Sequence, residues 1–239
     1  NPLRQSETAA RLARRGAVCR GSDSLKRVTV TPRDNWQKRL ENAGCAYHTI
    51  EDKPYWCETA AYEFTSTEID KIEDATNELH QMCMALAAET VINGAYEGYN
   101  FPDEVKQIAQ EAWLKSATGP GRPDHLLGRF DLGYNGKDIK LFEYNADTPT
   151  ALPEASIWQY HWLEDMKANS GILGEFGAKS IGDQFNSIHE ALVERWKKII
   201  PDIDSATINF AAQRDGQHED WGNIHYLLET ATEAGCRII

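Results

Sequence analysis

The stretch GRFDLGYNGKDIKLFEYNADTPT, residues 128–150, consists of two strand-like runs joined by a glycine turn. It carries one arginine, four acids and two amides, mostly at positions that a plain hairpin would give to valine or threonine. The apolar residues between them predict a partly buried hairpin. Ordinary turn residues and exposed salt bridges are one explanation of the polar set. A binding or catalytic site is the explanation we favour.

The register of this hairpin decides whether the polar side chains meet. Side chains alternate along a strand, so Arg129 and Asp131 share one face of the first strand. Glu143 and Asn145 likewise share one face of the second strand. A three-residue loop, residues 136–138, would place Asp131 opposite Glu143. The same register would pair Arg129 with Asn145, whereas a two-residue turn would separate the two faces.

In the register that pairs Asp131 with Glu143, two carboxylates and an amide oxygen converge beside a guanidinium. Asp131 and Glu143 would repel each other, and a divalent cation would remove that penalty. A small number of oxygen ligands suits Mg²⁺, which completes its octahedron with water and phosphate oxygens. Arg129 can clamp a phosphate or a carboxylate. The helix expected after a possible N-cap, Thr150, would add main-chain N–H donors if it points into the same pocket.

Composition narrows the class of protein. The chain has 239 residues, of which 41% are hydrophobic and 26% are charged, as is usual for one large globular domain or two small ones. Its net charge of -12 argues against a partner that is a nucleic acid or an anionic membrane. No apolar run approaches the roughly 18 residues that span a bilayer. The five scattered cysteines predict reduced thiols in a cytoplasmic protein.

The sequence divides into three regions. Residues 1–25 are basic, and we expect a disordered extension there, with a nucleic-acid tether or a targeting peptide as alternatives. Residues 26–200 form the main body and contain the hairpin. Residues 201–239 predict a strand, a helix and a second strand, which is the start of a β-α-β unit. Such units sit in larger sheets, so we expect the given sequence to be an N-terminal portion of a longer protein.

The fold class that follows is α+β or α/β, with helices packed on a mixed sheet, the polar hairpin and the incomplete β-α-β unit. Thr65 and Glu68 have the spacing of a capping box at the start of an amphipathic helix. His80 and Cys83 on that helix could touch one metal, but packing in the core is the interpretation we favour. The predicted helices cover about residues 36–42, 65–92, 102–115, a segment after Pro153, and 183–199.

The motif GRFDL with KLFEYNADTPT resembles the core signature of the glutathionylspermidine synthase family, whose synthetase domain has an ATP-grasp-like fold. The segments PYWCETAAYEF, ELHQMC, WLED and DQFNSIHE extend the likeness over roughly residues 26–239. It is greatest to the stand-alone branch without an amidase domain. The resemblance implies a carbon–nitrogen ligase that activates a peptide carboxylate as an acyl phosphate, which an amine then attacks.

Further implications concern individual residues and ligands. The resemblance implies that Asp131, Glu143 and Asn145 bind the Mg²⁺ that bridges the phosphates of ATP. It also implies that Arg129 contacts the nucleotide and the activated carboxylate. The same likeness implies that Thr148 helps to hold the acid substrate, and Thr150, at the start of the following helix, is a further candidate for binding that substrate. The best-known substrate pair is a glutathione-like peptide acid and an amine such as a polyamine.

Two departures from the family's pattern matter. Thr148, Pro149 and Thr150 replace its more serine-like run, so the likeness does not name the acid substrate. The family's nucleotide-clamping lysines and later acidic ligands would lie beyond residue 239, so we expect the given chain alone to be inactive. A non-catalytic module that binds an anionic peptide or small molecule is the main alternative. A glycosidase that uses Asp131 and Glu143 is disfavoured, because hydrolysis needs no adjacent arginine and asparagine.

Overall fold

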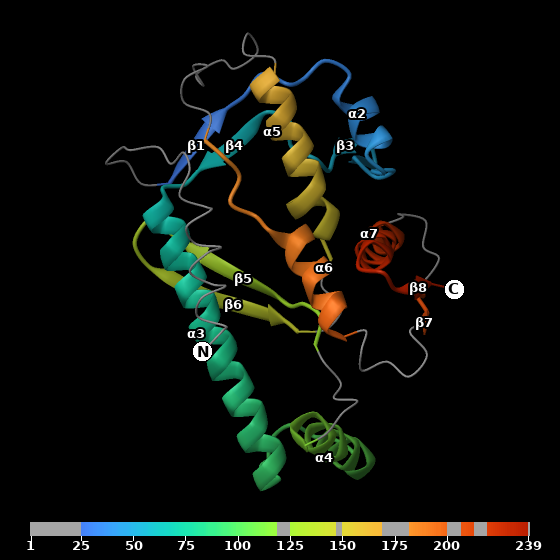
Figure 1. Cartoon of the computed structure of the whole chain (residues 1–239). Helices are drawn as coiled ribbons and strands as arrows, with labels where there is room; N and C mark the ends of the chain where they lie inside the picture. Colours follow the sequence, from blue (N-terminus) through green and yellow to red (C-terminus); the bar gives the residue numbers. More distant parts are fainter. Residues whose placement is uncertain are drawn as a thin grey trace.

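A computed structural model describes residues 25–118, 125–146, 150–168, 182–199, 207–212 and 219–238 (Figure 1). The predicted extension therefore lies, except for Leu25, outside the described residues. In chain order the elements are β1 (Lys26–Thr29), α2 (Trp36–Asn42), β2 (Thr49–Ile50), β3 (Lys53–Pro54), β4 (Ala60–Glu63), α3 (Ser66–Asn93), α4 (Asp103–Thr118), β5 (Arg129–Tyr134), β6 (Ile139–Asn145), η1 (Glu154–Trp158), α5 (Gln159–Ala168), α6 (Ile188–Ile199), β7 (Thr207–Ile208), α7 (Glu219–Glu233) and β8 (Arg237–Ile238).

The predicted fold class, a mixture of helices and strands, is confirmed. Antiparallel pairing joins β1 with β4, β2 with β3, and β5 with β6, while β7 and β8 pair in parallel around α7. The predicted β-α-β unit is therefore present. Within the described ranges the strands form separate two-stranded ladders rather than one continuous sheet. No described helix is long and apolar enough to cross a membrane.

The long helix α3 begins where the capping box predicts. The Glu68 N–H donates to the Thr65 hydroxyl at 3.2 Å, and the Thr65 N–H donates to the Glu68 carboxylate at 2.9 Å. The same carboxylate also accepts from the Leu25 N–H and the Tyr134 hydroxyl, both at 2.9 Å. One helix cap thus joins the N-terminal strand region, α3 and the hairpin.

The core is divided into small clusters that link distant parts of the chain. Trp158 is 1% exposed and packs with Leu40, Cys45 and Tyr47. A second cluster joins the start of the helix at residue 152 to α6 and α7 through Leu152, Leu192 and Tyr226. α6 starts at Ile188, five residues later than predicted. The Asn186 side chain accepts from the Ile188 N–H, the first of the helix, at 3.3 Å.

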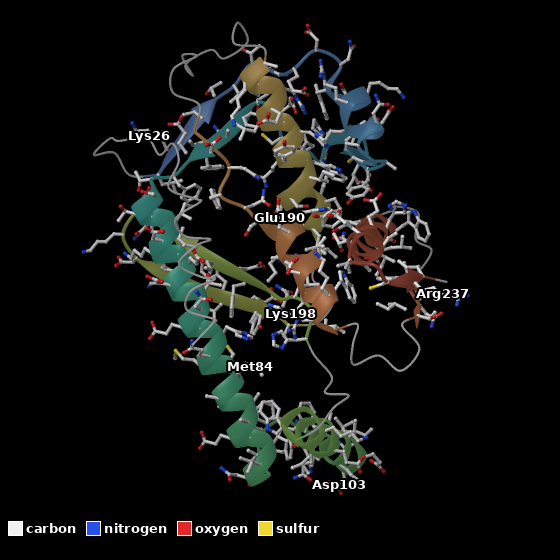
Figure 2. The ribbon with its side chains drawn as sticks, viewed as in Figure 1. Lys26, Met84, Asp103, Glu190, Lys198 and Arg237 are labelled. Carbon is white, nitrogen blue, oxygen red and sulfur yellow. The ribbon has the colours of Figure 1, made fainter. Side chains whose placement is uncertain are left out.

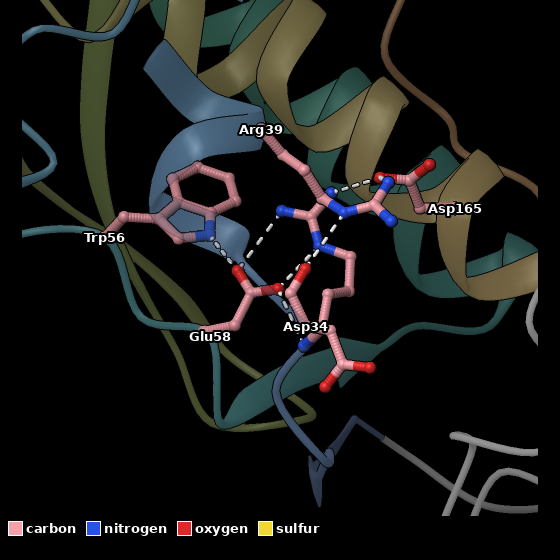
Figure 3. Close-up of polar contacts among 6 residues, drawn as sticks. Asp34, Arg39, Trp56, Glu58 and Asp165 are labelled. Carbon is pink, nitrogen blue, oxygen red and sulfur yellow. Dashed lines mark hydrogen bonds and ion pairs between the residues drawn. The ribbon is translucent and has the colours of Figure 1, made fainter. Parts of the chain in front are cut away.

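A buried ionic cluster fastens the segment before α2 to α5 (Figure 3). Arg33 and Glu58 have side chains that are each 3% exposed, and the Arg33 Nε lies 2.6 Å from a Glu58 oxygen. Arg33 also donates to Asp165 at 2.7 Å, and Trp56 donates its indole N–H to Glu58 at 2.7 Å. Arg39 reaches the same Asp165 oxygen at 3.0 Å. The cluster thus joins residues more than a hundred positions apart.

The far half of α3 and helix α4 expose many large apolar side chains. Figure 1 shows α3 extending beyond the hairpin with α4 at its far end, and Figure 2 labels Met84 and Asp103 in this part. Ile92 is 67% exposed and Ile108 is 65% exposed. The other members of this set are Met82, Met84, Leu86, Tyr99, Phe101, Val105 and Leu114. This arm contributes little to the core that positions the hairpin.

The shared cap predicts how stability responds to acid. Burial alone raises the pKa of Glu68, but donors from Thr65, Leu25 and Tyr134 outweigh it and lower the pKa from 4.5 to about 2. A lowered folded-state pKa gives stability that is complete above the unfolded value and is lost as pH falls through the folded value. Glu68→Gln should therefore be less stable than the unaltered protein at neutral pH, and the difference should shrink as pH falls from about 5 to about 2.

Urea unfolding at a series of pH values measures this difference. Glu89→Gln, which alters an exposed acid on the same helix, is the matched control and should show no such trend. A difference for Glu68→Gln that stays constant across the acid range would contradict the prediction.

The buried ionic cluster yields a second stability prediction. Glu58→Gln leaves the Arg33 guanidinium buried without its main counter-charge, so unfolding free energy should fall by about 3–5 kcal/mol. The double variant Arg33→Met with Glu58→Leu removes both charges and should lose less than Glu58→Gln alone. Chemical denaturation checks both, with the exposed Glu41→Gln as control. A double variant that loses as much unfolding free energy as Glu58→Gln, or more, would contradict the prediction.

Candidate functional site

The hairpin β5–β6 brings the predicted polar residues onto one face. Arg129 pairs with Asn145, and Asp131 pairs with Glu143. Directly paired residues in an antiparallel ladder point to the same side, with β-carbons about 5 Å apart. The predicted pairing is therefore confirmed.

The register has a different origin from the one predicted. Tyr134 pairs with Ile139, so the loop has four residues, 135–138, and the predicted three-residue loop is wrong. Asn135 belongs to the turn because its side-chain oxygen accepts from the N–H groups of Lys137 and Asp138, at 2.9 and 2.7 Å. A four-residue loop alone would put Asp131 opposite Phe142. A β-bulge between Asp131 and Leu132 restores the pairing of Asp131 with Glu143.

Phe142 is the extra residue of this bulge. Its side chain is 75% exposed, and a β-carbon added to Gly133 would come within 2.6 Å of its ring. The ring therefore lies over Gly133, where a larger residue would require the exposed ring to move. The bulge keeps the two acids on one face.

The opposite face of the hairpin packs against α3. Phe130 and Tyr144 stack with ring centroids 4.0 Å apart, and the Tyr144 hydroxyl lies 2.9 Å from His80 Nδ1. His80 therefore has a packing role here. Because these side chains occupy the face toward α3, the polar set lies on the face turned away from that helix.

Arg129 is held from two sides. Its Nε donates to Asp131 at 3.1 Å, and one terminal nitrogen, Nη1, donates to the Thr150 carbonyl at 2.9 Å. The side chains of Arg129 and Asp131 are 38% and 42% exposed, so this ion pair by itself stabilises little. The second terminal nitrogen, Nη2, makes no hydrogen bond with a described residue. That nitrogen can meet an anionic ligand.

The carboxylate and amide oxygens of this face fit a cation. Asn145 Nδ2 is buried without a hydrogen-bond partner among the residues that the structure describes, and an unpaired buried amide is costly. Turning the amide over would exchange this nitrogen for the side-chain oxygen, which can accept a hydrogen bond or ligate a cation. Two carboxylates and one amide oxygen are ligands of the kind Mg²⁺ takes. Among the described residues, no three His, Cys, Asp or Glu side chains gather closely enough for a metal, so an ion here would need the amide and further oxygens.

The segment after the hairpin differs from the prediction. Thr148 lies outside the described residues. Thr150 is not the N-cap, because the helix begins at residue 152 and Ala151 precedes it with φ 64°. The Leu152 N–H already donates to the Asn223 side chain at 3.0 Å, and Pro153 has no N–H. The first turn of the helix therefore has few main-chain donors left for an anion. The five residues after Pro153, Glu154–Trp158, form a π-helix.

Sequence reasoning missed the residues that hold this segment. Asn223 is 5% exposed, and Glu154 is 9% exposed. The hydroxyls of Tyr47 and Tyr55 donate to one Glu154 oxygen at 3.1 and 2.9 Å. Burial, and then the Glu154 charge, raise the pKa of both tyrosines. The sequence offers one signal for Asn223, which is a polar residue within the apolar pattern of the last helix.

The fold and the site together define a mixed α/β domain whose polar hairpin suits a cation and an anionic ligand. A family model described as "Glutathionylspermidine synthase preATP-grasp" matches residues 27–239. The chain therefore belongs to the glutathionylspermidine synthase preATP-grasp family.

Individual relatives agree with this assignment. A Haemophilus influenzae protein named "Putative acid--amine ligase" is 40% identical over 218 residues, which are 90% of this chain and 51% of that protein. The glutathionylspermidine synthase of Crithidia fasciculata is 33% identical over 85 residues, or 34% of this chain and 11% of that protein. The trypanothione synthetase of the same organism is 28% identical over 92 residues, which are 37% of this chain and 13% of that protein. The chain spans about half the length of the Haemophilus relative.

Proposed function

We propose that the complete protein is an ATP- and Mg²⁺-dependent ligase that joins a carboxylate to an amine through an acyl phosphate. The observation that carries this proposal is the pairing of Arg129–Asp131 with Asn145–Glu143 on one open face of the hairpin. Family membership and the name of the Haemophilus relative support the same reaction class. The β-hairpin would be the metal and acid-binding part of the active site.

The metal assignment follows from the chemistry of the side chains. Asp131, Glu143 and Asn145 would hold Mg²⁺. When bound, this ion would neutralise phosphate oxygens of ATP and so ease phosphoryl transfer to a carboxylate. Asp131 keeps one oxygen toward Arg129, which leaves its other oxygen for the ion. Glu143 is exposed and pairs with no described cation, so both of its oxygens remain available.

Arg129 would act on the reacting groups. Its contacts with Asp131 and the Thr150 carbonyl fix the guanidinium plane and leave Nη2 for the ligand. A fixed cation beside a carboxylate that accepts a phosphoryl group stabilises the negative charge of the transition state. The guanidinium would also contact the phosphates of the nucleotide. Thr148 and Thr150 are proposed to help bind the acid substrate.

The substrates are proposed from the relatives. Glutathionylspermidine and trypanothione appear in the names of the Crithidia proteins, which favours a glutathione-like peptide acid and a polyamine-like amine.

A cytoplasmic location is proposed for the enzyme, because the described cysteines are free thiols. The proposed arrangement is a basic extension at 1–25, the substrate part at 26–200 and a β-α-β unit at 201–239. The nucleotide clamp would lie in sequence beyond the match, so the isolated chain would be inactive.

The metal assignment is tested in the full-length protein. Asp131→Asn and Glu143→Gln should each lower Mg²⁺-dependent ADP release by at least about 100-fold, because each removes a charged ligand. ADP release with a panel of thiol peptides and polyamines is the measurement. Asp138→Asn, an acid in the turn of the same hairpin, is the control and should stay within about twofold. Near-normal activity of either ligand variant would show that the metal assignment is wrong.

Arg129→Lys tests the arginine separately. The guanidinium of arginine contacts Asp131 and Thr150 with two nitrogens and keeps a third for the ligand. Lysine keeps the charge but has a single nitrogen, so it cannot do both. We expect kcat to fall by about 100-fold with a smaller change in KM for ATP. Steady-state kinetics at saturating Mg²⁺ checks this. An unchanged kcat would remove Arg129 from the mechanism.

A further inference from the structure

The chain passes through a strained residue between the hairpin and the following helix. Ala151 has φ 64°, in the left-handed region. That region is disfavoured for any residue with a β-carbon, because the β-carbon crowds the following carbonyl oxygen. Such a conformation persists only where the surroundings hold it in place. Residues 150–154 are called the connecting segment below.

Hydrogen bonds hold the connecting segment on both sides of Ala151. On the hairpin side, Arg129 Nη1 donates to the Thr150 carbonyl at 2.9 Å. On the helix side, the Leu152 N–H donates to Asn223 Oδ1 at 3.0 Å in a buried contact. Asn223 is itself fixed, because its Nδ2 donates to the Glu219 carbonyl one turn earlier in α7 at 3.0 Å. The strained residue thus lies between two anchors.

A third anchor lies at the end of the connecting segment. Glu154 accepts from the hydroxyls of Tyr47 and Tyr55. Tyr47 in turn lies against α7, since a β-carbon added to Gly222 would come within 3.1 Å of its ring. The start of α7 therefore packs beside both the Asn223 contact and the Glu154 contact. Movement of α7 would be passed to the segment that carries the Thr150 carbonyl.

We propose that Asn223 is a positioning residue for Arg129, an inference that rests on the proposed ligase function. Asn223 holds Leu152, which keeps Ala151 in its left-handed conformation and sets the Thr150 carbonyl where it receives Arg129 Nη1. The guanidinium is then held by Asp131 and Thr150 together, with Nη2 directed by that plane. Without Asn223, the connecting segment relaxes and the arginine loses one of its two supports.

Kinetics of the full-length protein test this role. Asn223→Ala should lower kcat by about 10- to 100-fold, because a small misplacement of a catalytic group has an effect of that size. KM for ATP should change by less than about threefold, since Arg129 acts mainly in the transition state. Adding Ala151→Gly should recover at least about threefold of the lost kcat, because glycine adopts positive φ without strain.

The matched control lies on the same helix. Thr230 is fully buried and accepts from the Trp196 indole N–H at 3.1 Å, far along α7 from the connecting segment. Thr230→Val should destabilise the protein yet leave kcat within about twofold, since the hydrogen bonds of Thr230 go to Trp196 and Leu227 and not to the connecting segment. If Thr230→Val lowered kcat as much as Asn223→Ala, general destabilisation would explain both and the proposal would be overturned.

A second measurement does not depend on ligase activity. A thermodynamic cycle combines Arg129→Met with Asn223→Ala and follows urea unfolding. If the two residues act through one segment, the effect of the pair on the unfolding constant should differ from the product of the single effects by more than about threefold. Independent effects would overturn the positioning role.

The two measurements separate the proposals. Full-length protein that releases no ADP with any acid and amine, but shows coupling in the cycle, would refute the proposed function and support the link between Asn223 and Arg129. If Asn223→Ala does not fold, Asn223→Gln replaces it in both tests, because one extra methylene displaces the connecting segment while keeping the acceptor. Normal kcat in a folded Asn223→Gln variant would overturn the proposal.

Discussion

The pairing of Asp131 with Glu143 is the constraint on which the rest of the site depends. Side chains alternate along a strand, so a shift of one residue would send the two acids to opposite faces. The four-residue turn alone would produce that separation, and the bulge at Phe142 corrects it. A single inserted residue, accommodated over Gly133, therefore decides whether the hairpin can gather ligands for a cation.

The hairpin is held from one side and open on the other. Its apolar face rests on α3 through the Phe130–Tyr144 stack and the Glu68 cap. Its polar face meets the connecting segment through Arg129. The first arrangement joins residues 66 positions apart, whereas the second joins the hairpin to the segment that follows it. The proposed ligase chemistry needs this combination, because a metal and an arginine must keep fixed positions while a nucleotide and an acid enter between them.

Local signals in the sequence were sufficient to predict the start of the long helix and the face of the hairpin that carries the polar residues. The Thr65–Glu68 spacing predicted the start of α3, and alternation along the hairpin predicted which polar residues share a face. The origin of the register was not predictable in the same way, because it depends on Asn135 joining the turn and on Phe142 forming the bulge. The start of α6 was misplaced because Phe185 continues the apolar pattern yet packs against Phe64 outside the helix.

Contacts between distant residues lay beyond sequence reasoning. The Arg33–Asp165 and Leu152–Asn223 contacts have no local pattern, and the second of these replaces the expected N-cap.

The proposed function rests on one face of the hairpin, which we propose binds a divalent cation. Titration of full-length protein with Mn²⁺ in the presence of ADP, followed by electron paramagnetic resonance, tests it most directly. The account predicts a bound ion that is lost when Asp131→Asn and Glu143→Gln are combined, and unchanged binding in that double variant would contradict it.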